Sequence, residues 1–187
     1  MQFVLDNIAA VLIFGSVALV VLSTQISSTQ TTVETTISYA SKNQTLALGA
    51  TLEEELKLIG QGTTDKIEQI TQNGDGQTTK FVFWRNNGIQ DLQIEYRLVA
   101  TDTILVAGDE VPRYRMDRYE NSVYSGGSVP TLRDFVIETL DSSGNAVAFG
   151  SAVLVRARIR DTYPMGNPDD MHIGSSFWGM TLRPENL

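Results

Sequence analysis

Residues 8–22 form an uncharged run of fifteen residues, and this run constrains the chain more than any other feature. The apolar character reaches back to the start of the chain, and Asp6 is the only charged residue before Glu34. A helix from Gln2 to Leu22 would be about 30 Å long, which matches the hydrocarbon core of a bilayer. We therefore expect a helix of membrane-spanning length with one carboxylate near its start.

A membrane anchor, a secretory signal peptide and a buried core helix can all share this pattern. A signal peptide needs a positively charged start, but no Lys or Arg occurs before Lys42. Few soluble core helices carry so long an uncharged run at a terminus. The absence of Lys and Arg from the start of the chain argues against a signal peptide and suggests that a basic leader has already been removed. Without flanking Lys or Arg residues, the topology of an anchor is not determined.

Asp6 needs a stabilising partner, because a carboxylate inside an apolar segment is costly. One interpretation places it in the first helical turn, where the helix dipole favours a negative charge. The other interpretation pairs it with a positive group of a neighbouring chain, such as a free N-terminal amine. The residues leave both interpretations open.

Helical spacing of apolar residues continues into the Ser-, Thr- and Gln-rich segment that follows the uncharged run. These apolar residues are Leu22, Ile26, Val33, Ile37, Ala40, Leu48, Leu52, Leu56 and Ile59. Gly60 and Gly62 are suited to end the helix, and Gly49 should weaken it. We expect about sixty helical residues, bent or loosened in the middle, with a length of about 85–90 Å. The first half must be covered by lipid or by copies of itself.

After Gly62 the apolar spacing changes to the alternation that is typical of strands. Strands are expected at 80–85, 92–98, 113–119, 134–140, 147–159 and 176–182, with longer loops at 120–131 and 161–175. Residues 103–107 could continue the strand at 92–98 after a bend, and Ile67 and Ile70 belong either to a short strand or to a turn before the sheet. The fold class is therefore α+β, with a long N-terminal helix followed by an antiparallel sheet of six or seven strands. Residues 1–25 are the hydrophobic membrane or filament-core helix, 26–62 its amphipathic continuation, and 63–187 a β-rich domain.

Composition and motifs argue against catalytic activity and metal binding. The absence of Cys excludes disulfides, thiolate nucleophiles and Cys-ligated zinc, and the single His is His172. His172 follows Asp169 and Asp170, but the chain has no G-x-S-x-G elbow and no P-loop. Loops 73–76 and 167–172 hold the oxygen ligands that Ca²⁺ prefers, yet the same residues suit ordinary turns. A net charge of −8 argues against nucleic acid. We expect no enzyme activity, cofactor, metal or nucleic-acid partner.

The arginines of segment 156–160 alternate with apolar residues, and those of 113–115 form a similar pair. They either lie on a solvated sheet face with cross-strand partners or form a contact surface for the acidic run 53–55, in the same chain or a neighbour. Asn43-Gln44-Thr45 matches a glycosylation sequon, a pattern that often occurs by chance.

The order of these features resembles the type IV pilins and the pseudopilins of type II secretion. In that family the mature chain begins with an apolar segment of the form F-T-L-I-E, and its acidic residue is thought to pair with the N-terminal amine of an adjacent subunit. Gln2-Phe3-Val4-Leu5-Asp6 matches this segment when Gln2 is the first residue, with Asp6 in the Glu position. If Met1 is first, the acid falls one residue late. Many pilins also carry a C-terminal disulfide loop, which a chain without Cys lacks.

The resemblance implies a structural subunit of a pilus or pseudopilus that serves adhesion, motility or secretion and has no active site. The apolar helices would leave the inner membrane and pack as the core of an open helical filament on the cell surface or in the periplasm. The implied partners are identical subunits, a prepilin peptidase and the assembly machinery. The implied assembly residues are Phe3, Leu5, Asp6, Ile8, Val11, Phe14, Val17, Val21 and Leu22.

Other functions fit the same pattern. The chain could be a single-span membrane protein that displays a β-domain for binding a ligand or partner, without filament assembly. It could also be another helical assembly protein, such as an archaeal-type pilin or a phage structural protein. An enzyme is the remaining class, and no motif favours it.

Overall fold

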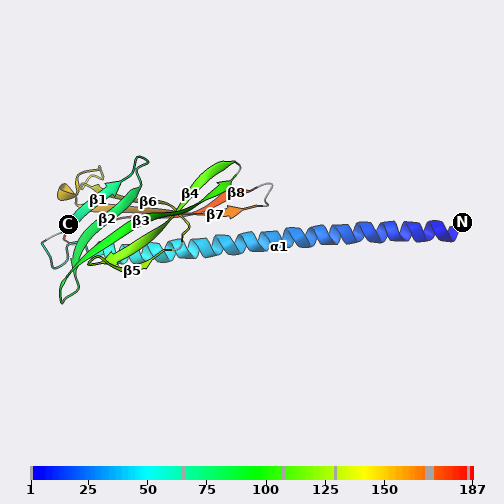
Figure 1. Cartoon of the computed structure of the whole chain (residues 1–187), viewed down its shortest axis with the longest axis horizontal. Coiled ribbons are helices and arrows are strands. Elements are labelled where there is room, and N and C mark those ends of the chain that lie inside the picture. Colours follow the sequence, from blue (N-terminus) through cyan, green and yellow to red (C-terminus); the bar gives the residue numbers. More distant parts are fainter. Residues whose placement is uncertain (1, 65, 107, 129, 167–170, 185) are drawn as a thin grey trace. The chain divides into compact units, whose positions relative to one another are not determined.

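The computed structural model describes residues 2–64, 66–106, 108–128, 130–166, 171–184 and 186–187, with side chains from Asn7 onward. The described residues form one long helix followed by an antiparallel eight-stranded sheet, so the predicted α+β fold class is confirmed (Figure 1). The elements are α1 (Gln2–Lys57), β1 (Ile67–Gln72), β2 (Thr78–Asn86), β3 (Asp91–Val106), β4 (Asp109–Glu120), β5 (Val123–Gly127), β6 (Leu132–Leu140), η1 (Phe149–Ser151), β7 (Leu154–Met165) and β8 (His172–Leu182). The chain divides into two compact units, Met1–Ile37 and Ser38–Leu187, and each is described by itself.

Helix α1 ends where the sequence predicts, after 56 helical residues without interruption. Gly60 and Gly62 follow it with φ angles of 71° and 67°. This left-handed conformation costs glycine little because it has no Cβ. The N–H of Gly60 donates a hydrogen bond of 2.8 Å to the carbonyl of Trp84, which ties the end of the helix to β2.

Gly49 lies inside the helix because the sheet approaches closely there. A Cβ atom at this position would lie only 2.5 Å from the ring of Trp178 on β8. The residue that the sequence marks as a weak point is therefore a point of contact between α1 and the sheet, and the expected loosening of the helix does not occur.

The strand order is β1-β2-β3-β4-β6-β7-β8, and β5 pairs with β4 beside this path. The expected strands agree with most of it, but the sheet has eight strands instead of six or seven, and four details differ. Strand β5 lies within the expected loop 120–131, and β7 begins at Leu154 because Phe149–Ser151 form the short helix η1. Strands β7 and β8 extend into the expected loop 161–175. Strand β3 continues to Val106 through a register shift, so the expected bend before 103–107 is an irregularity within one strand.

The sheet has a seam between β4 and β6, which share one residue pair among the described residues. There, side chains of the β1–β2 hairpin form hydrogen bonds with backbone groups of β6 that a paired strand would otherwise satisfy. Thr78 accepts the N–H of Ile137 at 2.9 Å, and Gln72 donates to the Ile137 carbonyl at 3.3 Å. Gln77 donates to the Arg133 carbonyl at 2.9 Å. The backbone of β6 is thus satisfied by side chains where a neighbouring strand is missing.

The core of the second unit lies between the end of α1 and the sheet. Leu52, Leu56 and Ile59 are fully buried, as their helical spacing predicts. Their neighbours from the sheet are Phe81, Phe83, Ile94, Tyr96, Met116, Phe135, Ile137, Val155, Ala157 and Ile159. Burying each large apolar side chain contributes about 1.5–3 kcal/mol. This core fixes the C-terminal part of the helix on the sheet.

Candidate functional site

The first unit exposes a run of large apolar side chains. Val11, Phe14 and Leu19 are 71%, 75% and 71% exposed. The other implied assembly residues with described side chains are exposed too, namely Ile8, Val17, Val21 and Leu22. The side chains of Phe3, Leu5 and Asp6 lie outside those that the structure describes. One helix in the described part of the chain is long and apolar enough to cross a membrane, and it contains this run.

The Thr-rich segment that follows satisfies many of its hydroxyl groups within the helix. The Oγ1 atoms of Thr24, Thr31, Thr32, Thr35 and Thr36 each donate to the carbonyl four residues earlier, at 2.7–3.0 Å. Such bonds remove the need for water at these donors. The segment is therefore less polar at its surface than its composition suggests.

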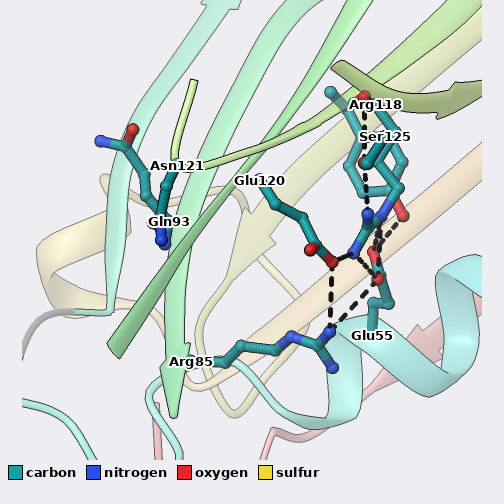
Figure 2. A network of polar contacts seen from close by, with 8 residues as sticks. Glu55, Arg85, Gln93, Arg118, Glu120, Asn121 and Ser125 are labelled. Carbon is teal, nitrogen blue, oxygen red and sulfur yellow. Dashed lines mark hydrogen bonds and ion pairs between the residues drawn. The ribbon is translucent and has the colours of Figure 1, made fainter. Parts of the chain in front are cut away.

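A network of ion pairs holds the end of α1 to the sheet in the second unit. We call it the Glu55 network, comprising Glu55, Arg85, Tyr96, Arg118, Glu120 and Ser125. Figure 2 labels all of these residues except Tyr96. Glu55 is only 8% exposed, and Arg118 donates to it from Nη2 at 2.5 Å and from Nε at 3.0 Å. Arg118 also donates to Glu120 at 2.6 Å, and Arg85 lies 3.8 Å from Glu55. The charges of two cations and two carboxylates thus balance, with Glu55, Arg85 and Arg118 largely buried and Glu120 partly exposed.

The network changes the proton affinity of two of its members. Burial raises the pKa of Tyr96, and the hydrogen bond that its hydroxyl donates to Glu55 raises it further. Burial opposes the charge of Arg118, but the hydrogen bonds to Glu55 and Glu120 outweigh it and raise the pKa of that guanidinium. Both groups keep their protons at neutral pH, so the network acts as a fixed structural tie.

A second polar contact lies between α1 and the strands β7 and β8, and we call it the hydroxyl seam. Asp161, 2% exposed, accepts hydrogen bonds from Ser41 at 2.6 Å and from the N–H of Thr162 at 3.0 Å. Hydrogen bonds also join the Ser176 hydroxyl to Thr45 at 2.6 Å and to Ser41 at 3.0 Å. Because Thr45 lies within α1 and is buried, the sequon at 43–45 does not form a surface loop.

A cavity of about 320 Å³ lies between α1 and the sheet in the second unit. The surface that lines it is mainly apolar and includes Leu48, Met116 and Leu132, with hydroxyl and amide side chains among the other lining residues. The charged groups in its lining, Asp161 and Arg118, are already engaged in the hydroxyl seam and the Glu55 network.

The exposed arginines of the sheet take partners from the sheet itself, as the first interpretation of the sequence held. The ion pairs are Arg113–Asp102, Arg115–Asp117, Arg156–Glu138, Arg158–Glu138 and Arg160–Asp134. Within the chain the acidic run 53–55 does not contact the 156–160 arginines, because Glu53 pairs with Lys57 and Glu55 with Arg118. The alternative interpretation is therefore wrong within one chain.

The two candidate calcium loops are 73–76 and 167–172. Asn73 accepts the N–H groups of Asp75 and Gln77 at 3.1 and 2.9 Å, which is the pattern of an ordinary Asx turn. Residues 167–170 lie outside the described residues. His172 begins β8 opposite Met165. No group of three His, Cys, Asp or Glu side chains suited to a metal occurs in the part of the chain that the structure describes.

Sequence reasoning missed both contacts between α1 and the sheet, although the sequence carries a signal for each. Glu55 lies three residues after Leu52 and four before Ile59, and Ser41 and Thr45 continue the same spacing. A carboxylate on the buried face of a helix needs a cation, and a buried hydroxyl needs an acceptor. The partners could not be named, because strand register was unknown.

The fold defines the class of protein only broadly, as an α+β chain with a long, partly apolar N-terminal helix and an antiparallel sheet. Comparisons with models of protein families, with curated proteins and with solved structures gave no match.

Proposed function

We propose that this protein is a structural subunit of a helical filament of the pilin or pseudopilin kind, assembled by packing of its N-terminal helices. The observation that carries the proposal is the run of ten large exposed apolar side chains between Ile8 and Leu22. Moving each of them out of water is worth about 1.5–3 kcal/mol, or on the order of 15–30 kcal/mol for the run. The helix therefore cannot remain in water and needs lipid or other helices around it.

Lipid and neighbouring helices bury apolar surface equally well, so hydrophobicity alone does not favour a filament. Close packing and polar contacts between helices must supply the difference. The Thr-rich segment supports this step, because its internally bonded hydroxyls at 24–36 allow close contact between helices without unsatisfied donors.

Asp6 has a specific role in the proposal. Its carboxylate pairs with the N-terminal amine of an adjacent subunit and so sets the register between helices. An unpaired carboxylate among apolar helices is costly, so the pairing selects one arrangement of subunits. Only the sequence supports this role, since the side chain of Asp6 lies outside those that the structure describes.

The long apolar helix can anchor the protein in a membrane before assembly. From there, in the proposal, subunits enter a filament at the cell surface or a pseudopilus in the periplasm, after cleavage by a prepilin peptidase and with the help of an assembly machinery. Identical subunits are the partners, and neither an active site nor a cofactor takes part.

A second candidate is a single-span membrane protein that displays its β-domain without assembling. The observation in its favour is the second unit itself, which has its own buried core and a cavity of about 320 Å³ suited to a small ligand. In this case the apolar helix is only an anchor.

Electron microscopy of the native full-length protein separates the two candidates. The filament proposal expects helical fibres with the N-terminal helices bundled at the axis. A monomer that stays dispersed in detergent and in the native membrane would contradict it.

The role of Asp6 is tested by substitution in the same assay. Asp6→Ala should abolish assembly and leave the β-domain folded, and Asp6→Glu should restore assembly because it keeps the carboxylate. Asp75→Ala, in an exposed turn of the β-domain, is the matched control and should assemble normally. Normal filaments of Asp6→Ala would refute the role of this residue, while the filament itself would stand.

A further inference from the structure

Strand β8 forms an open edge of the sheet. It pairs with β7 along all eleven residues without a register shift, and no described strand pairs with its other side. Every residue of β8 is at least partly exposed. Such an edge carries a row of N–H and C=O groups that only another extended chain can pair in full.

Proteins usually protect an open edge with a charge, a proline, a bulge or a very short strand. Strand β1, at the opposite end of the strand order, has six residues, two register shifts and Glu68. Strand β5, paired only with β4, has five residues. Strand β8 has none of these features, since it is long and regular and contains no Pro, Lys, Arg, Asp or Glu.

We propose that β8 pairs in the antiparallel direction with β8 of a second copy of this chain, with Phe177 opposite Phe177. Phe177 is the central residue of the strand and is 62% exposed. On the same face the pairing places Ser175 opposite Gly179 and Ile173 opposite Thr181. On the other face Ser176 lies opposite Trp178, and Gly174 lies opposite Met180.

The strand is complementary to itself in this register. Each of the largest side chains away from the centre, Trp178 and Met180, meets a small residue, and the two aromatic rings of Phe177 meet at the centre. Aromatic cross-strand pairs stabilise antiparallel sheets, and like charges placed opposite each other destabilise them. No charge of β8 opposes another here. This matters because two copies of a chain with net charge −8 repel each other elsewhere.

Gly179 has no side chain and so leaves room for the ring of Phe177 in this contact. A Cβ atom at this position would lie 2.9 Å from the ring of Phe177, so the ring lies along the strand beside the glycine. The stem of Arg158 on β7 lies next to the same position. The aromatic ring therefore lies over the glycine of its own strand and is exposed on this face, where a second ring can contact it.

Strand β1 of a second copy fits the edge of β8 less well than β8 of a second copy does. The two register shifts of β1 break the straight row of backbone groups that β8 offers, and its six residues cover only half of the eleven. A pairing of β8 with β8 also closes on itself, because the two copies are related by a twofold axis. It cannot repeat head to tail, so in the proposed filament it is a contact between two filaments, independent of the packing of N-terminal helices.

Cysteine cross-linking of the full-length protein in detergent tests the pairing, because the chain has no Cys of its own. Opposite residues of an antiparallel pair have Cα atoms about 4.5–5.5 Å apart, which is within the range of a disulfide. Phe177→Cys should give a disulfide-linked dimer on mild oxidation. Leu105→Cys, at an exposed apolar position on β3, is the matched control and should stay monomeric. A mixture of Ile173→Cys and Thr181→Cys should cross-link as a heterodimer more strongly than either variant alone.

A charge at the centre gives an independent test. Phe177→Lys places two ammonium groups opposite each other and should weaken self-association on the order of tenfold or more in sedimentation velocity. Leu105→Lys should leave it unchanged. Circular dichroism checks that both variants are folded. A monomeric wild-type chain, an uncross-linked Phe177→Cys, or a dimer equally strong in Phe177→Lys would overturn the proposal. The filament proposal has a separate readout, because Phe177→Lys should still form single fibres.

Discussion

The Glu55→Gln substitution removes one charge from the Glu55 network and keeps the size of the side chain. Arg118 then loses its two contacts with a carboxylate and keeps Glu120 at 2.6 Å. Removing one partner of a fully buried pair costs about 3–5 kcal/mol, and an exposed pair is worth about 0–1 kcal/mol. The side chains of Arg118 and Glu55 are 17% and 10% exposed, so the cost should lie between these limits. We expect a loss of about 2–3 kcal/mol in the free energy of unfolding.

Urea unfolding of the full-length chain in detergent, followed by tryptophan fluorescence, measures this loss. Both tryptophans, Trp84 and Trp178, lie in the second unit, so the signal reports on the part that the network stabilises. For a unit of this size the thermal midpoint should fall by about 4–12 °C. Glu54→Gln is the matched control, because Glu54 is the exposed neighbour in the same helix and should change stability by less than about 0.5 kcal/mol.

A double-substitution cycle tests the reasoning further. Arg118→Met combined with Glu55→Gln should cost less than the sum of the two single changes, by about 1–3 kcal/mol, because the second change removes the unpaired partner. If Glu55→Gln is no more destabilising than Glu54→Gln, or if the two effects simply add, the network does not hold the helix as argued.

Three further outcomes are expected. Gly49→Ala should destabilise the second unit by about 1–3 kcal/mol in the same urea assay, because the added Cβ would meet the ring of Trp178. This effect should exceed the gain from the better helix propensity of Ala. Gly15→Ala is the control, because Gly15 has open space around it and the substitution should not destabilise the protein. Because burial raises the pKa of Tyr96 in the folded state, its contribution to stability is complete below the ordinary tyrosine pKa of about 10 and is lost as pH rises above it. Tyr96→Phe should therefore flatten the fall in stability at alkaline pH; an unchanged alkaline slope would count against that assignment. Asp161→Ala should cost about 1–3 kcal/mol by removing the acceptor of the 2.6 Å hydrogen bond from Ser41, while the Thr162 N–H keeps the Thr131 carbonyl at 3.0 Å; thermal unfolding would detect this loss.

The elements with strong periodicity were predictable from the sequence. Spacing of Leu52, Leu56 and Ile59 gave the buried face of α1, and the two glycines after it gave its end. Strand β5 was not predictable in the same way, because its sequence VYSGG is short and rich in glycine. It forms through a tight turn in which Asn121 and Ser122 take positive φ angles of 47° and 67°. Such a turn depends on tertiary context more than on local preference.

The polar contacts were predictable only in part. Three consecutive glutamates at 53–55 suggest a solvated face, and only the position of Glu55 relative to the apolar residues indicates burial. Its partners Arg85 and Arg118 come from two strands that are far apart in sequence. Naming them requires the register of β2, β3 and β4, which no local pattern specifies. The assembly role of all the residues from Phe3 to Leu22 remains a prediction from the sequence.

The part of α1 in the second unit has two stretches that differ in the cost of exposing them to water: the stretch around Ser41 and Thr45 in the hydroxyl seam, and the stretch from Leu52 to Ile59. Opening the stretch around Ser41 and Thr45 exchanges hydrogen bonds between side chains for hydrogen bonds to water, at a net cost of about 0.5–1.5 kcal/mol each. It also rehydrates the carboxylate of Asp161, which favours opening. Lifting the stretch from Leu52 to Ile59 would instead expose fully buried apolar side chains. The stretch around Ser41 and Thr45 should therefore open more readily than the stretch from Leu52 to Ile59.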